Sequence, residues 1–277
     1  MTERYPVLSG AESFFMEGGQ TGVLISHGFM GTPQSVRFIG EKLAREGYTV
    51  LAPRLKGHGT SPYELEKCTY HEWYGELERG YKELRQHCSR VFVLGQSMGG
   101  TLSLWLARNN EGIDGVILVN PALTIPSYEH LRKKTVPRFL TEGEPDIKAK
   151  GVHEITFDST PLKSIQELQK LMDLTPGILP EITCPVLGIK SKEDHVVPPQ
   201  NTDYILEHIA SPDKQKVVLN NSYHVASMDH DKGKIVEGTH DFIQQTIGQD
   251  RDRKYYFLKK NDRVDSFTKG GFSKILR

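Results

Sequence analysis

Short apolar runs alternate with longer amphipathic segments along most of the chain. Runs typical of strands buried in a parallel sheet occur at residues 21–26, 48–52, 90–94, 116–119, 185–190 and 216–219. Helical spacing of apolar residues is found at 33–45, around 73–84, at 100–107, at about 199–209 and around 235–247. This alternation is typical of βαβ units, so we predict an α/β fold with a mostly parallel central sheet and helices on both faces.

The alternation stops between about residues 127 and 180, where no buried strand is predicted. This stretch holds a basic run at 132–134 and one convincing helical pattern after Thr160 and Pro161. An insertion of this size after a core strand predicts a small cap, which we place at about 121–182 within a domain that spans 1–248. Its apolar residues can line a narrow entrance or simply pack as a cap core; they include Phe139, Leu140, Ile147 and Ile155.

Composition excludes several classes of protein. The 35 Lys and Arg residues balance the 35 Asp and Glu residues, so nothing over the main body indicates a nucleic-acid groove. The three cysteines are odd in number and lack metal-binding spacing, which indicates buried thiols in a reducing compartment. The sequence shows neither a signal-peptide pattern at its start nor an apolar run long enough to cross a bilayer, so we expect a cytoplasmic protein.

The most informative motif is residues 95–99, which read Gly-Gln-Ser-Met-Gly. This is the G-x-S-x-G pattern, and a predicted strand at 90–94 precedes it while a predicted helix follows. A strand that enters a helix through a glycine-flanked turn lifts the serine oxygen above the end of a parallel sheet. We therefore predict Ser97 to be a nucleophile; the alternative is an ordinary glycine-rich turn.

A serine hydroxyl is a weak nucleophile at neutral pH and needs a base, whose tautomer is fixed by an acid. In enzymes with this elbow, the acid and then the base follow the serine along the chain. The acid is expected after the strand at 185–190, where Asp194 is the first candidate and Glu193 the second. Either residue can instead be an ordinary turn carboxylate.

The base is expected in the loop after the last strand. His224 lies in that loop, directly before the terminal helix, and its position distinguishes it from the other ten histidines. His195 lies beside the acid and is expected to be its neighbour rather than its partner. His230 lies deeper in the start of the helix.

Two backbone N–H groups are needed to stabilise a developing oxyanion. One belongs to the residue after the nucleophile, Met98, and the other comes from the loop after the first core strand. In that loop, residues 27–31, the glycines permit a sharp reversal and Phe29 is placed to supply the second N–H. His27 can be a group of the site, although a structural hydrogen bond within the loop is favoured.

Together these residues resemble the α/β-hydrolase superfamily and, within it, the small bacterial monoacylglycerol lipases and carboxylesterases. The matching segments are 27–33, 54–60, 96–100, 193–199 and 221–226, and the likeness runs from about residue 10 to about residue 247. The first three segments are shared with many relatives. The last two are more specific to the monoacylglycerol lipases.

The resemblance implies an α/β-hydrolase fold with Ser97, Asp194 and His224 as catalytic triad, Phe29 and Met98 as oxyanion donors, and a small cap over an acyl tunnel. In that family a cap glutamate contacts the glycerol head. By its position in the segment 152–155 this residue would be Glu154, for which the alternative is a solvated charge. The resemblance implies no cofactor and no metal.

The expected function is a serine hydrolase that cleaves carboxylic esters through an acyl-enzyme, with monoacylglycerols of medium or long chain as substrates. One alternative is a general short-chain carboxylesterase. An acyltransferase is less favoured, because no identified residue would keep water from the acyl-enzyme. An alternative of another class is a catalytically silent ligand-binding hydrolase fold, which loss of a triad residue would have favoured. We expect a monomer or homodimer with no nucleic-acid partner.

Residues 249–277 extend beyond the hydrolase pattern. Nine Lys and Arg residues and four Asp residues are mixed there with Tyr255, Tyr256, Phe257, Leu258, Phe267 and Phe272. The segment is expected to be a poorly ordered or loosely docked appendage. The alternative is a weak tether to an anionic membrane surface, where each basic residue contributes about 1 kcal/mol.

Overall fold

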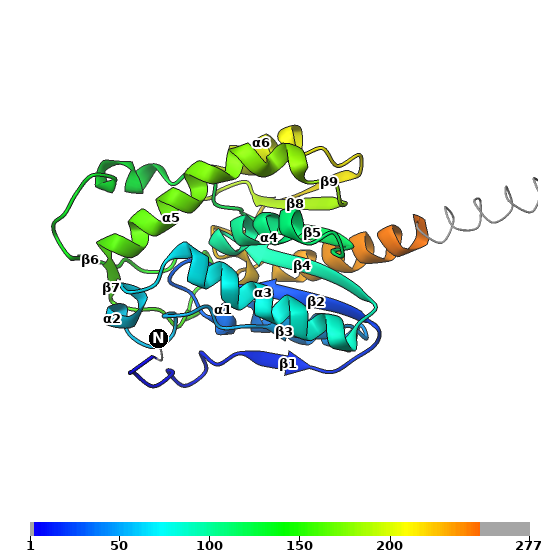
Figure 1. The fold of residues 1–277 in the computed structure, drawn as a ribbon, viewed down its shortest axis with the longest axis horizontal. Coiled ribbons are helices and arrows are strands. Elements are labelled where there is room, and N and C mark those ends of the chain that lie inside the picture. The colour runs from blue at the N-terminus through cyan, green and yellow to red at the C-terminus, as the bar shows by residue number, and fades with distance from the viewer. Residues whose placement is uncertain (1–2, 250–277) are drawn as a thin grey trace, which may run out of the picture.

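The computed structural model describes residues 3–249, and a seven-stranded sheet forms their centre (Figure 1). The strand order is β1-β3-β2-β4-β5-β8-β9, and all neighbours are parallel except β1 and β3. The strands are β1 (Phe14–Met16), β2 (Thr21–Ser26), β3 (Thr49–Ala52), β4 (Arg90–Gln96), β5 (Gly115–Val119), β8 (Val186–Ser191) and β9 (Lys214–Leu219). The predicted parallel sheet is therefore confirmed, and β1 adds an antiparallel edge strand.

Helices follow most of the parallel strands. They are α1 (Pro33–Arg45), α2 (Pro62–Leu65), α3 (Tyr70–His87), α4 (Met98–Asn109), α5 (Leu162–Leu174), α6 (Gln200–His208) and a terminal helix at residues 232–249. The described residues also form short 3-10 segments, which are η1 (Pro126–Leu131), η2 (Thr175–Glu181) and η3 (Ala226–Met228). α1 begins at Pro33, as predicted from the helical spacing at 33–45.

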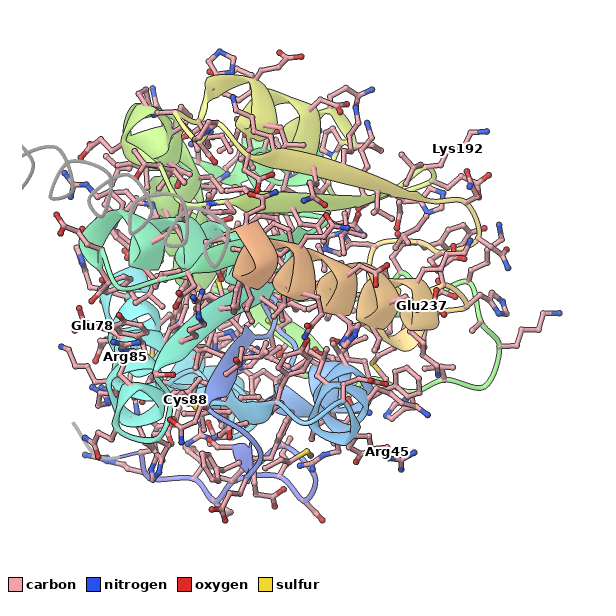
Figure 2. The ribbon with its side chains drawn as sticks, turned by 90° about the vertical axis from the view of Figure 1, so that its right-hand side faces the viewer. Arg45, Glu78, Arg85, Cys88, Lys192 and Glu237 are labelled. Atoms are coloured by element: carbon pink, nitrogen blue, oxygen red, sulfur yellow. The ribbon has the colours of Figure 1, made fainter. Side chains whose placement is uncertain are left out.

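Both faces of the sheet are buried, because successive residues of a strand point to opposite sides. On β4, Val91 and Val93 pack into the hydrophobic cluster that α3 and α4 share. Phe92 and Leu94 pack into the second cluster, which α1 and the terminal helix cover. Figure 2 shows the orange terminal helix beside α1, with α3 on the other side of the sheet. The central strands are thus apolar throughout, as predicted for a doubly covered sheet.

The segment between β5 and β8 holds η1, α5, η2 and a two-stranded antiparallel pair, β6 (Phe139–Thr141) with β7 (Ser159–Pro161). The helix predicted after Thr160 and Pro161 is present as α5. Three of its residues, Leu168, Leu171 and Met172, belong to the same hydrophobic cluster as α3 and α4. The inserted segment is therefore packed against the main core on that side.

Three further predictions concern the cysteines, a membrane-spanning segment and the C-terminal extension. Cys68 and Cys88 are buried, Cys184 is half-buried, and no disulfide joins them. No helix within residues 3–249 has the length and apolar character required to cross a membrane. Both alternatives for the basic and aromatic extension concern residues that lie, apart from Gln249, outside the described part of the chain.

Candidate active site

Ser97 lies in a sharp turn between β4 and α4. Its φ of 54° and ψ of −121° are values that residues other than glycine rarely adopt. A Cβ atom on Gly95 would lie 2.2 Å from the carbonyl oxygen of Gly99, and one on Gly99 would lie 2.3 Å from the carbonyl oxygen of Ser26. Only glycine fits at both flanks, so the G-x-S-x-G pattern is a steric requirement of this turn.

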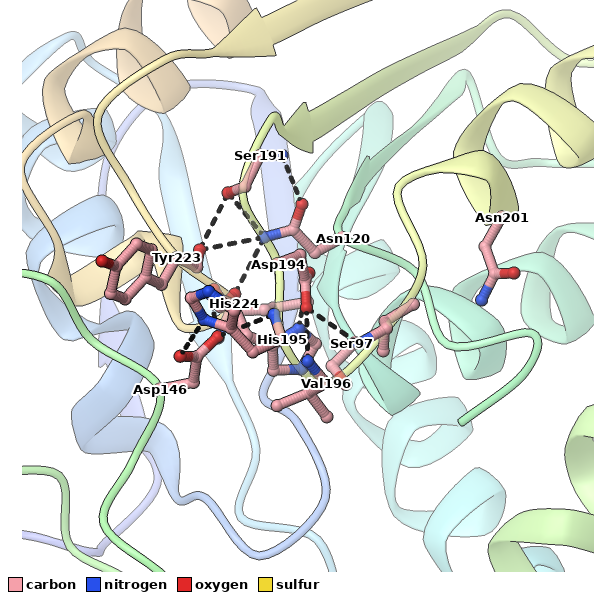
Figure 3. A network of polar contacts seen from close by, with 12 residues as sticks. Ser97, Asn120, Asp146, Ser191, Asp194, His195, Val196, Asn201, Tyr223 and His224 are labelled. Carbon is pink, nitrogen blue, oxygen red and sulfur yellow. Dashed lines mark hydrogen bonds and ion pairs between the residues drawn. The ribbon is translucent and has the colours of Figure 1, made fainter. Parts of the chain in front are cut away.

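The structure brings Ser97, His224 and Asp194 together (Figure 3). The Nε2 atom of His224 lies 2.9 Å from the Ser97 hydroxyl oxygen, and its Nδ1 atom lies 2.8 Å from Oδ2 of Asp194. When Nδ1–H donates to the carboxylate, Nε2 is left as the acceptor for the serine proton. This is the tautomer that general-base catalysis by His224 requires.

The carboxylate of Asp194 is held in one orientation. Its side chain is 1 % exposed, and its Oδ1 atom accepts the backbone N–H groups of Val196 at 2.9 Å and Val197 at 2.8 Å. Glu193, the second candidate for the acid, is 55 % exposed and pairs with Lys148 at 3.2 Å. Of the two carboxylates, Asp194 is the one that forms a hydrogen bond with His224.

The two other histidines considered for the base do not contact Ser97. His195 is largely exposed and its Nδ1 atom lies 2.8 Å from Oδ1 of Asp146, a hydrogen bond that raises the pKa of His195. His230 is exposed, and its backbone N–H donates to Asp229 at 2.7 Å. His195 is thus a neighbour of the acid, as expected, and His224 alone among the three faces the serine.

The loop after β2 runs directly against the elbow. A Cβ atom on Gly28 would lie 3.3 Å from the Cβ atom of Ser97. Neither the Phe29 nor the Met98 backbone N–H has a hydrogen-bond acceptor within residues 3–249, which leaves both amides available to an oxyanion beside Ser97. His27 has the structural role: Nδ1–H donates to the Gly28 carbonyl at 2.9 Å, and burial lowers the pKa of His27 to about 4.

A cavity of about 120 Å³ opens above Ser97 and His224. Its apolar walls come from Phe29, Met30, Ile125, Tyr128, Val196 and Val225. The residues proposed for a narrow entrance do not line it. Leu140 instead packs against Leu131, Leu162 and Ile165, and Phe139 faces the ring of Tyr63 at 5.3 Å. Leu140 therefore belongs to a small cap core, the other interpretation that the sequence allowed, whereas Phe139 contacts α2 outside the cap.

The polar wall of the cavity is acidic. Its carboxylates belong to Glu142, Glu144, Asp146 and Glu154. Glu154 is buried rather than solvated, with 8 % of the residue exposed. Burial raises the pKa of the Glu154 carboxyl to about 7, while the nearby His224 and a hydrogen bond with Ser35 act in the opposite direction. This carboxyl can therefore hold or release a proton near neutral pH.

Three polar residues that the sequence reasoning missed hold the histidine loop. Asn120, with a φ of 44°, donates from Nδ2 to the His224 carbonyl at 2.9 Å and accepts the Ser191 N–H on Oδ1 at 2.7 Å. Asp146 and Asp229 accept backbone N–H groups of the same loop. Asn120 and Pro121 directly after β5 could have signalled a turn of this kind; neither aspartate carries a local signal.

Within residues 3–249 no group of three or more His, Cys, Asp or Glu side chains is arranged as a set of metal ligands. The polar groups around Ser97 instead form a chain from an acid through a base to a hydroxyl. A mostly parallel sheet with a serine elbow, and with an acid and a histidine on loops after later strands, defines an α/β-hydrolase.

Comparison with known proteins places the chain more closely. The family described as "Serine aminopeptidase, S33" matches residues 20–231, and the chain belongs to this family. A thermostable monoacylglycerol lipase of Bacillus sp. (strain H-257) is 45 % identical over 250 residues, which cover 90 % of this chain and 100 % of the lipase. A carboxylesterase of Bacillus subtilis (strain 168) is 26 % identical over 84 % of this chain and 96 % of its own length.

Solved structures agree on the fold. A chain from work on LipS and LipT, two metagenome-derived lipolytic enzymes, superimposes with a TM-score of 0.84 at 41 % identity, covering 87 % of this chain and all of the other. A monoacylglycerol lipase of Paleococcus ferrophilus has a TM-score of 0.70 at 19 % identity, covering 85 % and 98 %. The family description speaks of peptidases and these relatives of lipases and esterases, so family membership alone leaves the substrate open.

Proposed function

We propose that the protein hydrolyses carboxylic esters, with monoacylglycerols as preferred substrates. The observation that carries the proposal is the pair of hydrogen bonds from Ser97 through His224 to Asp194 at the base of a cavity. In this proposal Ser97 is the nucleophile, His224 the general base, and Asp194 the acid that orients it. Residues 121–182 act as the cap over the site.

The reaction proceeds through an acyl-enzyme. The Ser97 oxygen attacks the ester carbonyl as its proton passes to Nε2 of His224, and the Phe29 and Met98 amides stabilise the oxyanion. His224 then gives this proton to the departing alkoxide, and the alcohol leaves. Water enters, loses a proton to His224, attacks the acyl group by the same route and releases the carboxylic acid.

Glu154 supports a polyol as the leaving group. A buried carboxyl is costly unless it is hydrogen-bonded, and the hydroxyl groups of a glycerol head are donors that would satisfy it. Within residues 3–249, no lysine or arginine lines the cavity. This wall therefore suits a neutral head with several hydroxyls, which agrees with the name of the 45 % identical Bacillus relative.

A general short-chain carboxylesterase is the second candidate, and the size of the cavity favours it. At about 120 Å³ the space is smaller than the cavity of about 150 Å³ that holds a benzene molecule, so a long acyl chain requires the cap to shift. The two candidates differ in chain-length preference. Monoacylglycerols of 8 to 18 carbons and p-nitrophenyl acetate and butyrate should be compared by kcat/KM, with Ser97→Ala as the blank.

A higher kcat/KM for the monoacylglycerols would support the proposal. A higher kcat/KM for the two short esters would show that the protein is a general short-chain carboxylesterase. Triolein serves as a bulky control, because a closed cap admits one acyl chain more easily than three. Efficient fatty-acid release from triolein would contradict a narrow site. A fluorophosphonate that labels wild type but not Ser97→Ala would exclude a silent binding fold.

A further inference from the structure

The cap segment and the loop that carries His224 are joined by two carboxylates, each contributed by a different side. From the cap segment, Asp146 accepts the backbone N–H of His224 on Oδ2 at 3.0 Å. Its own carbonyl oxygen accepts the N–H of Val225 at 3.1 Å. One cap residue therefore receives hydrogen bonds from two successive residues of the histidine loop.

The second carboxylate, Asp229, belongs to the histidine loop and binds the cap segment. Asp229, which is 1 % exposed, follows His224 in the same loop. It accepts the N–H groups of Lys148 at 2.7 Å and Ala149 at 3.0 Å, both in the cap segment. It also accepts the N–H of Tyr223 at 2.9 Å, the residue directly before the histidine.

Asp146 also extends to the loop of the acid. Its carboxylate accepts the backbone N–H of His195 at 3.2 Å and pairs with the His195 ring at 2.8 Å. His195 is adjacent to Asp194, the partner of His224. A single cap carboxylate thus touches both loops that meet at the imidazole.

We infer that Asp146 and Asp229 are positioning residues, which lock residues 146–149 of the cap onto the His224 loop and so set the cavity wall and the base as one unit. The inference rests on the proposed function of His224. Charge-assisted hydrogen bonds to backbone N–H groups are stronger than neutral ones, and four of them cross between cap and catalytic loops here through these two side chains. A fifth hydrogen bond joins Asp146 to the His195 ring.

The test compares Asp146→Ala and Asp229→Asn with wild type. Alanine removes both acceptor oxygens of Asp146. In Asp229→Asn the NH₂ end of the amide is a donor, so it cannot replace a carboxylate that accepts N–H groups on both oxygens. We expect kcat for p-nitrophenyl butyrate to fall about 10- to 100-fold with KM within about threefold, since a displacement of about 1 Å costs up to about 10²-fold. The rate of fluorophosphonate labelling of Ser97 should fall in parallel. The double variant should lose less than the product of the single losses.

Asp231→Asn is the matched control. Asp231 is a buried carboxylate two positions from Asp229 and accepts the Asn221 N–H at 2.6 Å, but it bonds no cap residue. Asp231→Asn should keep kcat and labelling within about threefold of wild type, at a folded fraction verified by urea titration. Should Asp229→Asn fail to fold, Asp146→Ala decides, since that side chain is 16 % exposed.

Three results have distinct meanings. Folded Asp146 and Asp229 variants that label at the wild-type rate would overturn the inference while leaving the proposed function intact. An equal loss in Asp231→Asn would also overturn it, because the effect would then belong to the loop and not to the junction with the cap. Failure of wild type to label at Ser97 would instead defeat the proposed function.

Discussion

A Cβ atom on Gly31 would lie 2.7 Å from the Oε1 atom of Glu154, inside the contact distance of the two atoms. The loop after β2 leaves room for the buried carboxyl because residue 31 is glycine. The same loop carries Phe29, which lines the cavity. One stretch of backbone therefore shapes both the candidate oxyanion site and the acidic wall of the cavity.

Gly31→Ala should displace Glu154 from the cavity wall. We expect an overpacking cost of about 1–3 kcal/mol in the free energy of unfolding. Loss of one hydrogen bond to a polyol head should raise KM for a monoacylglycerol roughly 3- to 10-fold, with a smaller effect on p-nitrophenyl butyrate. Gly143→Ala is the control, because residue 143 lines the same cavity but a Cβ atom there meets nothing within 4 Å. Equal effects of the two substitutions would contradict the prediction.

Ser97→Ala should remove nearly all turnover, by roughly 10⁶-fold as in other enzymes that lose this nucleophile. Alanine carries the same Cβ atom as serine, so the strained turn at φ 54° is unchanged and the fold should persist. Turnover of p-nitrophenyl butyrate and circular dichroism of the purified variant provide the measurement. A variant that kept a tenth of normal activity would show that another residue attacks the ester.

His224→Ala should be nearly as inactive as Ser97→Ala, because the two residues act as one unit. His195→Ala should retain much of its activity, since the His195 ring is 59 % exposed and contacts Asp146 rather than the serine. Initial rates of both variants on one soluble ester test the pair. If His195→Ala were inactive and His224→Ala active, the general base would be His195 and not His224.

Glu154→Gln should change how stability depends on pH. The pKa of Glu154 is raised from 4.5 to about 7 in the folded protein, so between these values the folded state holds a proton that the unfolded state has lost. Stability therefore falls as pH rises through this window, by up to about 3 kcal/mol above pH 7. Glutamine cannot ionise, so the variant should lose this decline between pH 5 and pH 8. Urea titrations measure it, with Glu144→Gln, an exposed cavity residue, as control; an unchanged decline would refute the assignment.

A chain that ends at Gly248 should hydrolyse soluble esters at close to the full rate, because the candidate triad and the β-sheet lie before that residue. If residues 249–277 tether the protein to anionic surfaces, truncation should weaken cosedimentation with phosphatidylserine vesicles, and added salt should do the same to the full chain. Loss of soluble-ester activity would instead make the segment part of the folded core or of an oligomer interface.

Much of the site could be predicted because its chemistry is tied to local patterns. Ser97 is marked by glycines that the turn requires, and His224 and Asp194 are marked by their places after particular strands. The choice between Asp194 and Glu193 could be argued only from position, since adjacent carboxylates differ in direction, and direction comes from the bonds to Val196 and Val197.

Asp146 and Asp229 could not be predicted, because their partners are backbone N–H groups distant along the chain, and a backbone N–H has no sequence signature. The shortest strands of the fold could not be predicted either. β1, β6 and β7 have three residues each, too few to show the period-two alternation by which strands are recognised. Their positions are set by tertiary contacts rather than by local pattern.

The junction at residues 146–149 also bears on how caps can be exchanged between relatives. A graft made at the ends of the inserted segment, between β5 and β8, would carry Asp146 into a host but leave the residue at 229 behind. Such a chimera would have a new cap but would lack the hydrogen bonds by which Asp229 holds residues 148 and 149 of the cap. A successful exchange would move the histidine loop together with the cap, or stop before residue 146, so the boundary of the replaceable unit lies inside the insertion and not at its ends.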